Sequence, residues 1–354
     1  MKHVLKILLF YTLLASCARS ETDYTKLFPI RKNLELTKVK EISSDMLGMP
    51  GDIFCIRDYF VIQDEIDNYW YSLFNKKTGE LVRYFAPKGR GPQEILYPMD
   101  QGVHGDNFYV YDSSLEIIHI YSLDSLLAHK DNCITKSIKI HFKNKQNAQC
   151  RNLVLLESGE IIANCCHPEG HLVLFDTAGM EKKAFFPDYP YDPLHKDENY
   201  IPKSFAFQYN CRIDPRNERL YNISTTTGHF QIFNIKKDSL ERIVNNVYYL
   251  PKYENTCSGE NYGVLFSKDN TPGLFNPEVT DKYIYAGYEE QPAPHTHMAY
   301  DVLYQFNLDG TPAVCYNLSN RISRFYIDNE TGTLYAISAD PITREPYIYQ
   351  AKVE

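Results

Sequence analysis

Few residues in this 354-residue chain have the types and spacing that chemistry requires. His295 and His297 are separated by one residue, so an extended backbone would place both imidazoles on one side, as a metal site needs. Asp64, Glu65 and Asp67 bring together carboxylates of the kind that serve acid–base hydrolysis. The histidines follow a Pro-rich loop that suggests no third ligand, and the carboxylates lie where a turn is expected. The sequence therefore names no catalytic residue, no metal and no cofactor.

The segment Gly89-Arg90-Gly91-Pro92 has the glycines of a phosphate-binding loop but lacks the Lys-Ser/Thr pair and the helix that should follow. We expect a connector whose glycines allow positive φ angles and whose arginine pairs with a carboxylate such as Glu94. The alternative is that Arg90 contacts a ligand. Neither a G-x-S-x-G elbow nor an H-E-x-x-H motif occurs in the chain.

Aromatic residues in Pro-rich loops are further binding candidates. Tyr189 and Tyr191 alternate with prolines, and His195 follows them. Such loops suit stacking on sugars or docking of partners, because little entropy is lost when they bind. The alternative is that this loop packs on its own sheet. The ligand-binding candidates, taken as a group, are Arg90, Tyr189, Tyr191, His195, His295 and His297.

The elements that must position these residues have the composition of β-strands. Short runs rich in Tyr, Phe, Ile, Val and Leu are separated by Gly, Asp, Asn and Pro, and tyrosine alone occurs 29 times. Residues 52–56, 59–64, 70–75 and 81–85 form four such runs joined by tight turns. Four short antiparallel strands make one blade of a β-propeller.

This unit recurs along the chain. Its marker is a strand that ends in an aromatic residue and is followed by a polar turn, and the markers are Phe74, Tyr121, Phe175, Phe233, Phe306 and Tyr349. The sixth unit ends before its last strand, whereas residues 34–42 alternate apolar and polar and precede the first unit. We therefore predict an all-β, six-bladed propeller of four-stranded antiparallel blades, in which this N-terminal strand completes the last blade and closes the ring.

Strand order separates two faces of such a ring. Turns after the first and third strands of a blade lie at one end, and the remaining connections lie at the other. The expected third-to-fourth turns are all short, whereas the long connections, 87–100, 187–204, 250–276 and 289–300, share the other end. Long loops in compact domains are usually functional, so we predict that ligand contact comes from this end.

The N-terminus has the pattern of a lipoprotein signal. Lys2 and Lys6 precede a short apolar stretch that ends in Leu14-Ala15-Ser16-Cys17, which is similar to a bacterial lipobox. We predict a signal peptide over residues 1–16, a lipid on Cys17, a tether over 17–32 and one propeller domain over 33–354. An ordinary signal peptide with an incidental cysteine is the alternative. Membrane contact is expected through this lipid anchor, on an exported, monomeric protein of the cell envelope, and no basic cluster suggests nucleic acid as a partner.

Two kinds of covalent modification can be considered. Eight cysteines follow Cys17 without a repeated or C-x-x-C spacing, and they are either buried thiols or the partners of one or two disulfides. Asp-Ser/Thr-apolar triplets resemble O-glycosylation sites of Bacteroides-type bacteria. The modified residues would be Ser125, Thr177 and Ser239.

The segment Gly89-Arg90-Gly91-Pro92-Gln93-Glu94, together with Phe306-Asn307-Leu308-Asp309-Gly310 and Glu345-Pro346-Tyr347-Ile348-Tyr349, resembles the six-bladed β-propeller lipoproteins of Bacteroides-type bacteria, the TolB-like propellers. The resemblance extends over nearly the whole mature chain and implies an envelope lipoprotein without implying a reaction. The favoured hypothesis is a binding or interaction scaffold for a glycan, peptide or protein partner. The alternative is a hydrolase or lyase that acts on polysaccharide at the same face.

Overall fold

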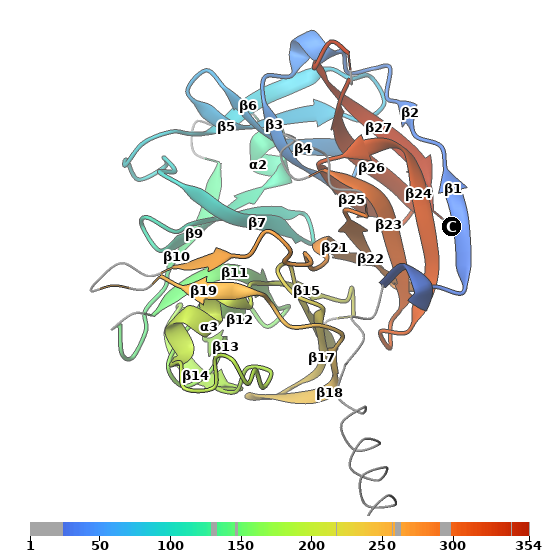
Figure 1. The fold of residues 1–354 in the computed structure, drawn as a ribbon. Helices are drawn as coiled ribbons and strands as arrows, with labels where there is room; N and C mark the ends of the chain where they lie inside the picture. Colours follow the sequence, from blue (N-terminus) through green and yellow to red (C-terminus); the bar gives the residue numbers. More distant parts are fainter. Residues whose placement is uncertain are drawn as a thin grey trace, which may run out of the picture.

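The computed structural model describes residues 24–128, 133–145, 148–216, 218–256, 258, 263–290, 299–340 and 342–353. These residues form a ring of six blades around a central axis, as Figure 1 shows. The predicted fold class is therefore confirmed. Within the described residues no helix is long and apolar enough to cross a membrane.

Each blade is an antiparallel sheet whose strands follow one another in the chain from the inner edge outward. Blade 1 contains β3 (Pro50–Ile56), β4 (Tyr59–Ile66), β5 (Tyr69–Asn75) and β6 (Leu81–Pro87), and blade 2 contains β7 (Pro98–His104), β8 (Asn107–Asp112), β9 (Ile117–Ser122) and β10 (Ile134–Lys139). Blade 3 contains β11 (Gln149–Leu155), β12 (Ile161–Cys166), β13 (Leu172–Phe175) and β14 (Glu181–Phe185), and blade 4 contains β15 (Tyr209–Ile213), β16 (Arg219–Ser224), β17 (His229–Lys236) and β18 (Ser239–Val247). Blade 5 contains β21 (Phe275–Val279), β22 (Tyr283–Tyr288), β23 (Tyr300–Asn307) and β24 (Pro312–Ile322).

Blade 6 is completed by the N-terminal part of the chain. Its strands are β25 (Arg324–Asp328), β26 (Thr333–Ala339), β27 (Pro346–Lys352) and, at the outer edge, β2 (Thr37–Lys38). All six aromatic markers lie on the third strand of their blade, so the alignment of the repeat was correct.

Of the predicted closing strand over residues 34–42, only Thr37–Lys38 pairs with the last blade. β2 pairs antiparallel with β27 as expected, whereas β1 (Ile30–Leu34) pairs in parallel with β24 and adds a fifth strand to blade 5. Just before β1, the ring of Phe28 stacks on Tyr304 of blade 5 at 4.2 Å between ring centroids. The propeller thus begins before residue 33, and its N-terminal segment stabilises two neighbouring blades.

The core consists of apolar residues packed between adjacent blades. Val61 and Leu73 of blade 1 meet Phe108 and Val110 of blade 2 in one such cluster. The first and last blades are also joined by charge, because Lys76 Nζ lies 3.2 Å from the Asp328 carboxylate and both side chains are largely buried. These contacts make a rigid frame for the side chains near the axis.

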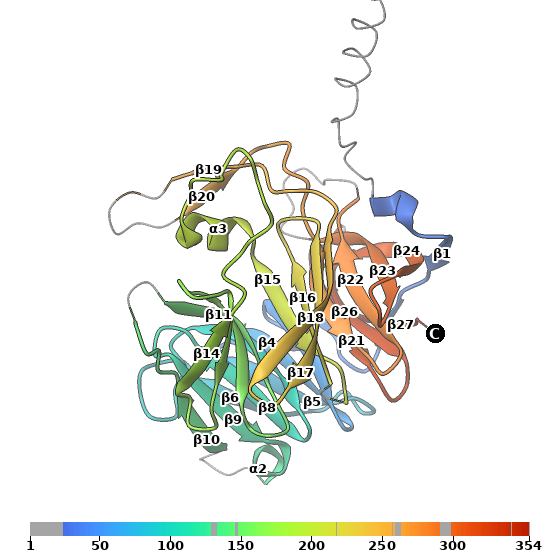
Figure 2. The same ribbon diagram turned by 90° about the horizontal axis from the view of Figure 1, so that it is seen from below.

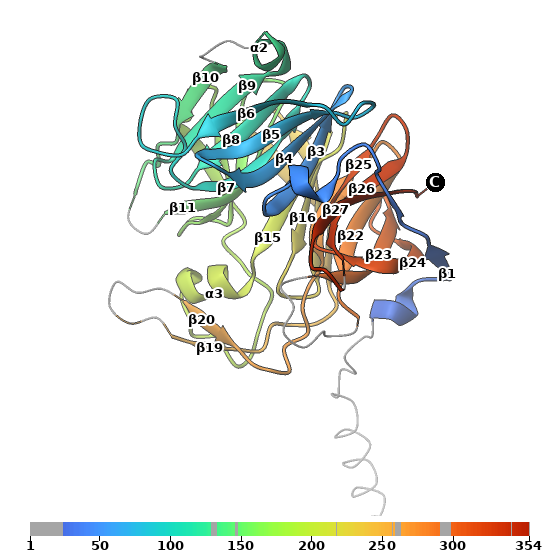
Figure 3. The same ribbon diagram turned by 90° about the horizontal axis from the view of Figure 1, so that it is seen from above.

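The two ends of the ring differ as predicted, with one exception. Helix α3 (Tyr200–Ala206) and the hairpin of β19 (Tyr253–Asn255) and β20 (Val264–Phe266) lie at one end, which we call the long-loop face (Figures 2 and 3). The opposite end, the short-turn face, was expected to carry only short turns. It carries helix α2 (Leu123–Leu127) between β9 and β10, so the prediction for that turn was wrong. After the marker Tyr121 the chain continues with leucines, and the helix they form buries Leu123 and Leu126.

Candidate functional site

Each inner strand directs one or more polar side chains toward the cavities at the propeller axis, and one residue from each strand forms a ring of six. We call these six residues the axial ring. They are Asp52 of β3, Gln101 of β7, Asn152 of β11, Arg212 of β15, Glu278 of β21 and Arg324 of β25.

Local irregularities of the inner strands help to aim these side chains. In four of the six strands the pairing with the second strand shifts next to the axial residue, and such bulges re-aim side chains at functional sites. The shifts lie between Pro50 and Asp52, between Pro98 and Asp100, between Cys150 and Asn152, and between Phe275 and Glu278.

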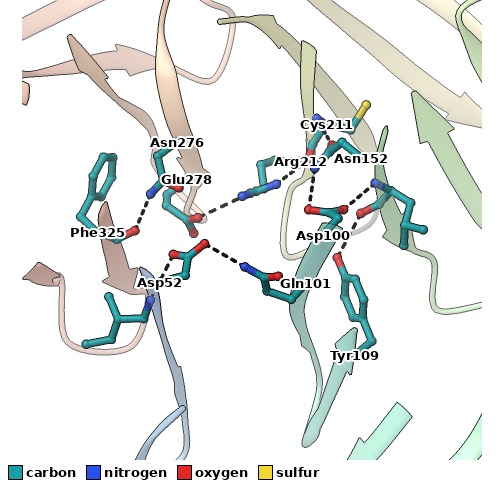
Figure 4. Close-up of polar contacts among 12 residues, drawn as sticks. Asp52, Asp100, Gln101, Tyr109, Asn152, Cys211, Arg212, Asn276, Glu278 and Phe325 are labelled. Atoms are coloured by element: carbon teal, nitrogen blue, oxygen red, sulfur yellow. Dashed lines mark hydrogen bonds and ion pairs between the residues drawn. The ribbon is translucent and has the colours of Figure 1, made fainter. Parts of the chain in front are cut away.

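Asp100, beside Gln101, organises one side of the ring (Figure 4). Its carboxylate accepts hydrogen bonds from Asn152 Nδ2 at 2.9 Å and from the backbone N–H of Leu153 at 2.7 Å. The Asn152 side-chain oxygen in turn accepts from the backbone N–H of Cys211. Blades 2, 3 and 4 are thereby joined by one polar chain at the axis.

The other side of the ring contains two acids and a partly buried cation. Gln101 Nε2 donates to Asp52 Oδ2 at 3.1 Å, and Arg212 Nε lies 3.4 Å from Glu278 Oε1. Figure 4 shows the carboxylates of Asp52 and Glu278 pointing toward one another. Arg324 Nη1 donates to the Tyr300 hydroxyl at 3.1 Å, so this second cation is fixed at the edge of the same space.

Burial shifts the acid–base properties of these carboxyl groups. Desolvation raises the pKa of Glu278 to about 7, partly offset by the nearby charge of Arg212. Desolvation also raises the pKa of Asp100 to about 6 and raises the pKa of Asp52 above its ordinary value. Acidic groups whose pKa values are raised by burial are frequent in functional sites.

Two cavities meet at the axial ring. The upper cavity, about 650 Å³, opens at the long-loop face, where Thr226 and Asn270 line it. The lower cavity, about 400 Å³, reaches the short-turn face at Gly105. Arg212 and Gln101 line both, so they form the waist between them.

The upper cavity is rich in groups that form directional hydrogen bonds. Seven of its side chains are amides, namely Gln63, Gln101, Asn152, Gln208, Asn210, Asn270 and Asn276. The rings of Phe275 and Tyr300 stack 5.5 Å apart on its wall at an interplanar angle of 12°. Its size falls within the roughly 300–1,000 Å³ of small-molecule sites.

The glycine loop predicted to be a connector has that structure. Gly91 donates its N–H to the Glu94 carboxylate at 2.7 Å, and the indole N–H of Trp70 donates to the carbonyl of Ile95 at 2.8 Å. Gly89 has a φ of +153°, and a Cβ there would collide with the Glu94 carboxylate. Glu94 therefore pairs with the backbone in place of the expected partner Arg90, whose side chain is exposed.

The candidates that the structure describes in the 189–195 loop have different surroundings. Tyr189 packs on His171 and Phe207, so the alternative of a loop packed on its own blades describes this residue. Tyr191 is 75% exposed. His195 stacks on Tyr253 with 3.9 Å between ring centroids.

His195 lies beside a separate cavity of about 470 Å³ on the outer side of the long-loop face. Its Nδ1 lies 3.2 Å from Glu198, and its Nε2 lies 4.0 Å from Asp192. Within the described ranges, no group of three or more His, Cys, Asp or Glu residues is arranged to hold a metal ion.

The remaining sequence candidates are placed as follows. Cys17, His295 and His297 lie outside the described residues. Ser125 lies within helix α2, Thr177 is exposed in the turn between β13 and β14, and Ser239 begins β18. All three serine and threonine residues thus lie toward the short-turn face, where their modification stays a prediction.

Sequence reasoning missed the axial ring altogether. A signal was present, because each predicted unit begins with a short run in which polar residues interrupt apolar ones. Two of these runs even share the order Pro-x-Asp, at Pro50–Asp52 and at Pro98–Asp100. Alignment of the units on their first strand, instead of the third, would have gathered these residues.

Comparison with known proteins gives a consistent result for the fold. Residues 30–330 match the model of a family described as TolB-like 6-blade propeller-like. Among solved structures, a member of the DUF4221 family from Bacteroides vulgatus is similar with a TM-score of 0.59 at 10% identity, over 90% of this chain and 98% of that one. A protein of Bacteroides fragilis, described as exported, is similar with a TM-score of 0.54 at 11% identity, over 91% of this chain and 98% of that one. A search of curated proteins returned no significant match.

Proposed function

The chain belongs to the TolB-like six-bladed propeller family, and on that premise we propose that it is an envelope binding protein whose upper cavity holds a carbohydrate. The observation that carries this proposal is the lining of the cavity by seven side-chain amides. A side-chain amide has donors and an acceptor in one plane, which matches the alternating donor and acceptor character of sugar hydroxyls. Asn152 and Asn270 already bond within the protein at both ends, so the other amides are the more available ones.

The other groups of the upper cavity fit the same ligand class. The partly exposed ring of Phe275, stacked on the buried ring of Tyr300, supplies an apolar surface for the C–H face of a sugar ring. Arg324 adds a positive charge at the wall, fixed by Tyr300 and by the carbonyl of Ser323 at 2.9 Å. A peptide or protein partner, the other ligand classes considered from the sequence, would be expected to use the outer loops more than this polar interior.

The ligand proposal is tested by screening the purified chain on a glycan array and measuring the affinity of any hit by calorimetry. Asn210 lines the upper cavity, and its side chain makes no hydrogen bond within the described residues. Asn210→Ala should therefore lower affinity about tenfold while the thermal midpoint stays unchanged, since a lost hydrogen bond contributes about 0.5–1.5 kcal/mol. Asn317→Ala, on the outer strand β24, is the matched control and should bind as wild type.

If no saccharide binds, or if Asn210→Ala binds as tightly as the control, the cavity does not hold a carbohydrate. If Asn210→Ala still binds the saccharide but Tyr191→Ala does not, the binding site is the exposed loop beside the outer cavity.

Anchoring at the envelope by a lipid on Cys17 is part of the proposal. It is supported by the lipobox-like Leu14-Ala15-Ser16-Cys17 and by the structural similarity to a protein described as exported. Cys17→Ser should abolish palmitate labelling and release the protein from the membrane fraction. Equal labelling and equal membrane association of the variant and wild type would exclude this anchor.

A second function is favoured by one specific observation, the raised pKa values of Asp52 and Asp100 in the wall of the upper cavity. A carboxyl group whose pKa is raised toward neutral pH can act as a general acid on a bound polysaccharide. An assay for new reducing ends or unsaturated products would detect this activity in wild type, and Asp100→Asn should abolish it. Binding without turnover would favour the scaffold.

A further inference from the structure

Two cysteines of blade 3 lie directly opposite each other. Cys150 of β11 is the register partner of Cys165 of β12, and their Sγ atoms are 3.2 Å apart. Both residues are no more than 1% exposed. The pair therefore combines close approach with complete burial.

The backbone geometry of this pair suits a covalent bond. The N–H of Cys165 donates to the carbonyl of His171 at 2.9 Å, on the side of β13. In an antiparallel sheet a residue directs its N–H and C=O to the same neighbour, so Cys165 and Cys150 form a non-hydrogen-bonded pair. Such pairs have Cα atoms about 4.5 Å apart, inside the range of roughly 4.4–6.8 Å found for disulfides.

We propose that Cys150 and Cys165 form a disulfide that joins the first and second strands of blade 3. A small side-chain rotation suffices, because the sulfurs must approach by only about 1 Å to reach the bond length of about 2.05 Å. The neighbouring thiols are placed less well. Cys166 follows Cys165 along the strand and so points to the opposite face, and Cys211 donates to the side-chain oxygen of Asn222 at 3.2 Å.

The reaction needs an external disulfide as oxidant. The two thiols lose two protons and two electrons and form one S–S bond, while the oxidant's disulfide is reduced to two thiols. An exported compartment supplies such oxidants through thiol–disulfide oxidoreductases. Burial raises the pKa of the Cys165 thiol well above its ordinary value, so we expect the bond to form during folding, before the strands are enclosed.

The bond would fix part of the axial ring. The bulge of β11 lies between Cys150 and Asn152, and Asn152 connects Asp100 to the backbone of Cys211. A crosslink at Cys150 restrains the strand at the start of this bulge. This inference does not depend on which ligand the upper cavity takes.

The test uses the full chain folded with oxidised and reduced glutathione, then denatured in excess alkylating reagent and digested with trypsin without reduction. Cleavage after Lys145 and Arg151 releases Cys150 in peptide 146–151, while Cys165 and Cys166 fall in peptide 152–182. We expect the two peptides to appear as one linked species that separates on reduction. Recovery of both peptides fully alkylated before reduction would overturn the proposal.

Two variants identify the partners. Cys166→Ser should keep the linked species, and Cys150→Ser should lose it and lower the thermal midpoint by roughly 4 °C. Loss of the link in Cys166→Ser would assign the bond to Cys166 and refute the pairing. A link from peptide 146–151 to Cys211 would refute it equally.

Discussion

The protonation of Glu278 makes the stability of the propeller depend on pH in a direction that can be tested. Its pKa is raised to about 7 from the ordinary value of 4.5, chiefly by desolvation. Between these two values the folded state keeps a proton that the unfolded state has lost. The free energy of unfolding must therefore fall as the pH rises through this window.

The size of the effect follows from the two pKa values. Each tenfold difference in proton affinity corresponds to about 1.4 kcal/mol, so this group alone should lower the free energy of unfolding by roughly 2.5 kcal/mol between pH 5 and pH 8. The conversion is justified because the Glu278 side chain is only 13% exposed. Asp100 acts in the same direction and adds to the wild-type slope.

Glu278→Gln should remove this part of the pH dependence. The amide cannot titrate, so the difference in stability between pH 5 and pH 8 should be smaller than in wild type by roughly 2.5 kcal/mol. At pH 5 the folded Glu278 is protonated, so it is charged beside Arg212 only toward pH 8, and the raised pKa already includes that interaction.

Urea unfolding at the two pH values measures this difference by linear extrapolation. Trp70, the single tryptophan, reports on blade 1, and circular dichroism reports on all the sheets. Glu241→Gln, at a residue whose side chain is 60% exposed, is the control and should leave the pH dependence unchanged. The free energy of unfolding could change by the same amount between pH 5 and pH 8 in Glu278→Gln and in wild type. Glu278 would then be charged at both pH values, and the desolvation argument would be wrong.

Two further predictions concern the closure of the ring. Phe28→Ala should lower the free energy of unfolding by about 3 kcal/mol, because it removes a buried ring stacked on Tyr304. Phe28→Leu should recover most of this loss. Equal stability of wild type and both variants in urea would show that the N-terminal contact is dispensable. Lys76→Ala should lower the free energy of unfolding by about 2 kcal/mol, because Asp328 is left without its partner. Lys77 has a side chain that is 74% exposed, so Lys77→Ala should lower it by less than about 0.5 kcal/mol. The reverse order of stability in thermal melts would refute the role of this ion pair.

The sequence alone determined the repeat and the fold class. Aromatic residues that end the third strand of each unit, such as Phe74 and Phe306, mark the blades because strand periodicity is local and survives in the linear order. Leu34, Leu36 and Val39, apolar members of the alternating segment 34–42, are buried. The described parts of the connections 187–204 and 250–276 lie at the predicted end, since antiparallel order fixes this by counting strands.

Tertiary structure decided the partners and the site. The alternation of apolar and polar residues over 34–42 shows which face is buried but not which strand lies beside it. The sequence therefore could not predict that β1 pairs with β24 and β2 with β27. The axial ring takes one residue from each of six strands separated by about 50 residues or more, and closure of the ring makes them neighbours. The pKa of Glu278 likewise depends on the burial and the charges that this closure creates, and neither is encoded in its sequence neighbours.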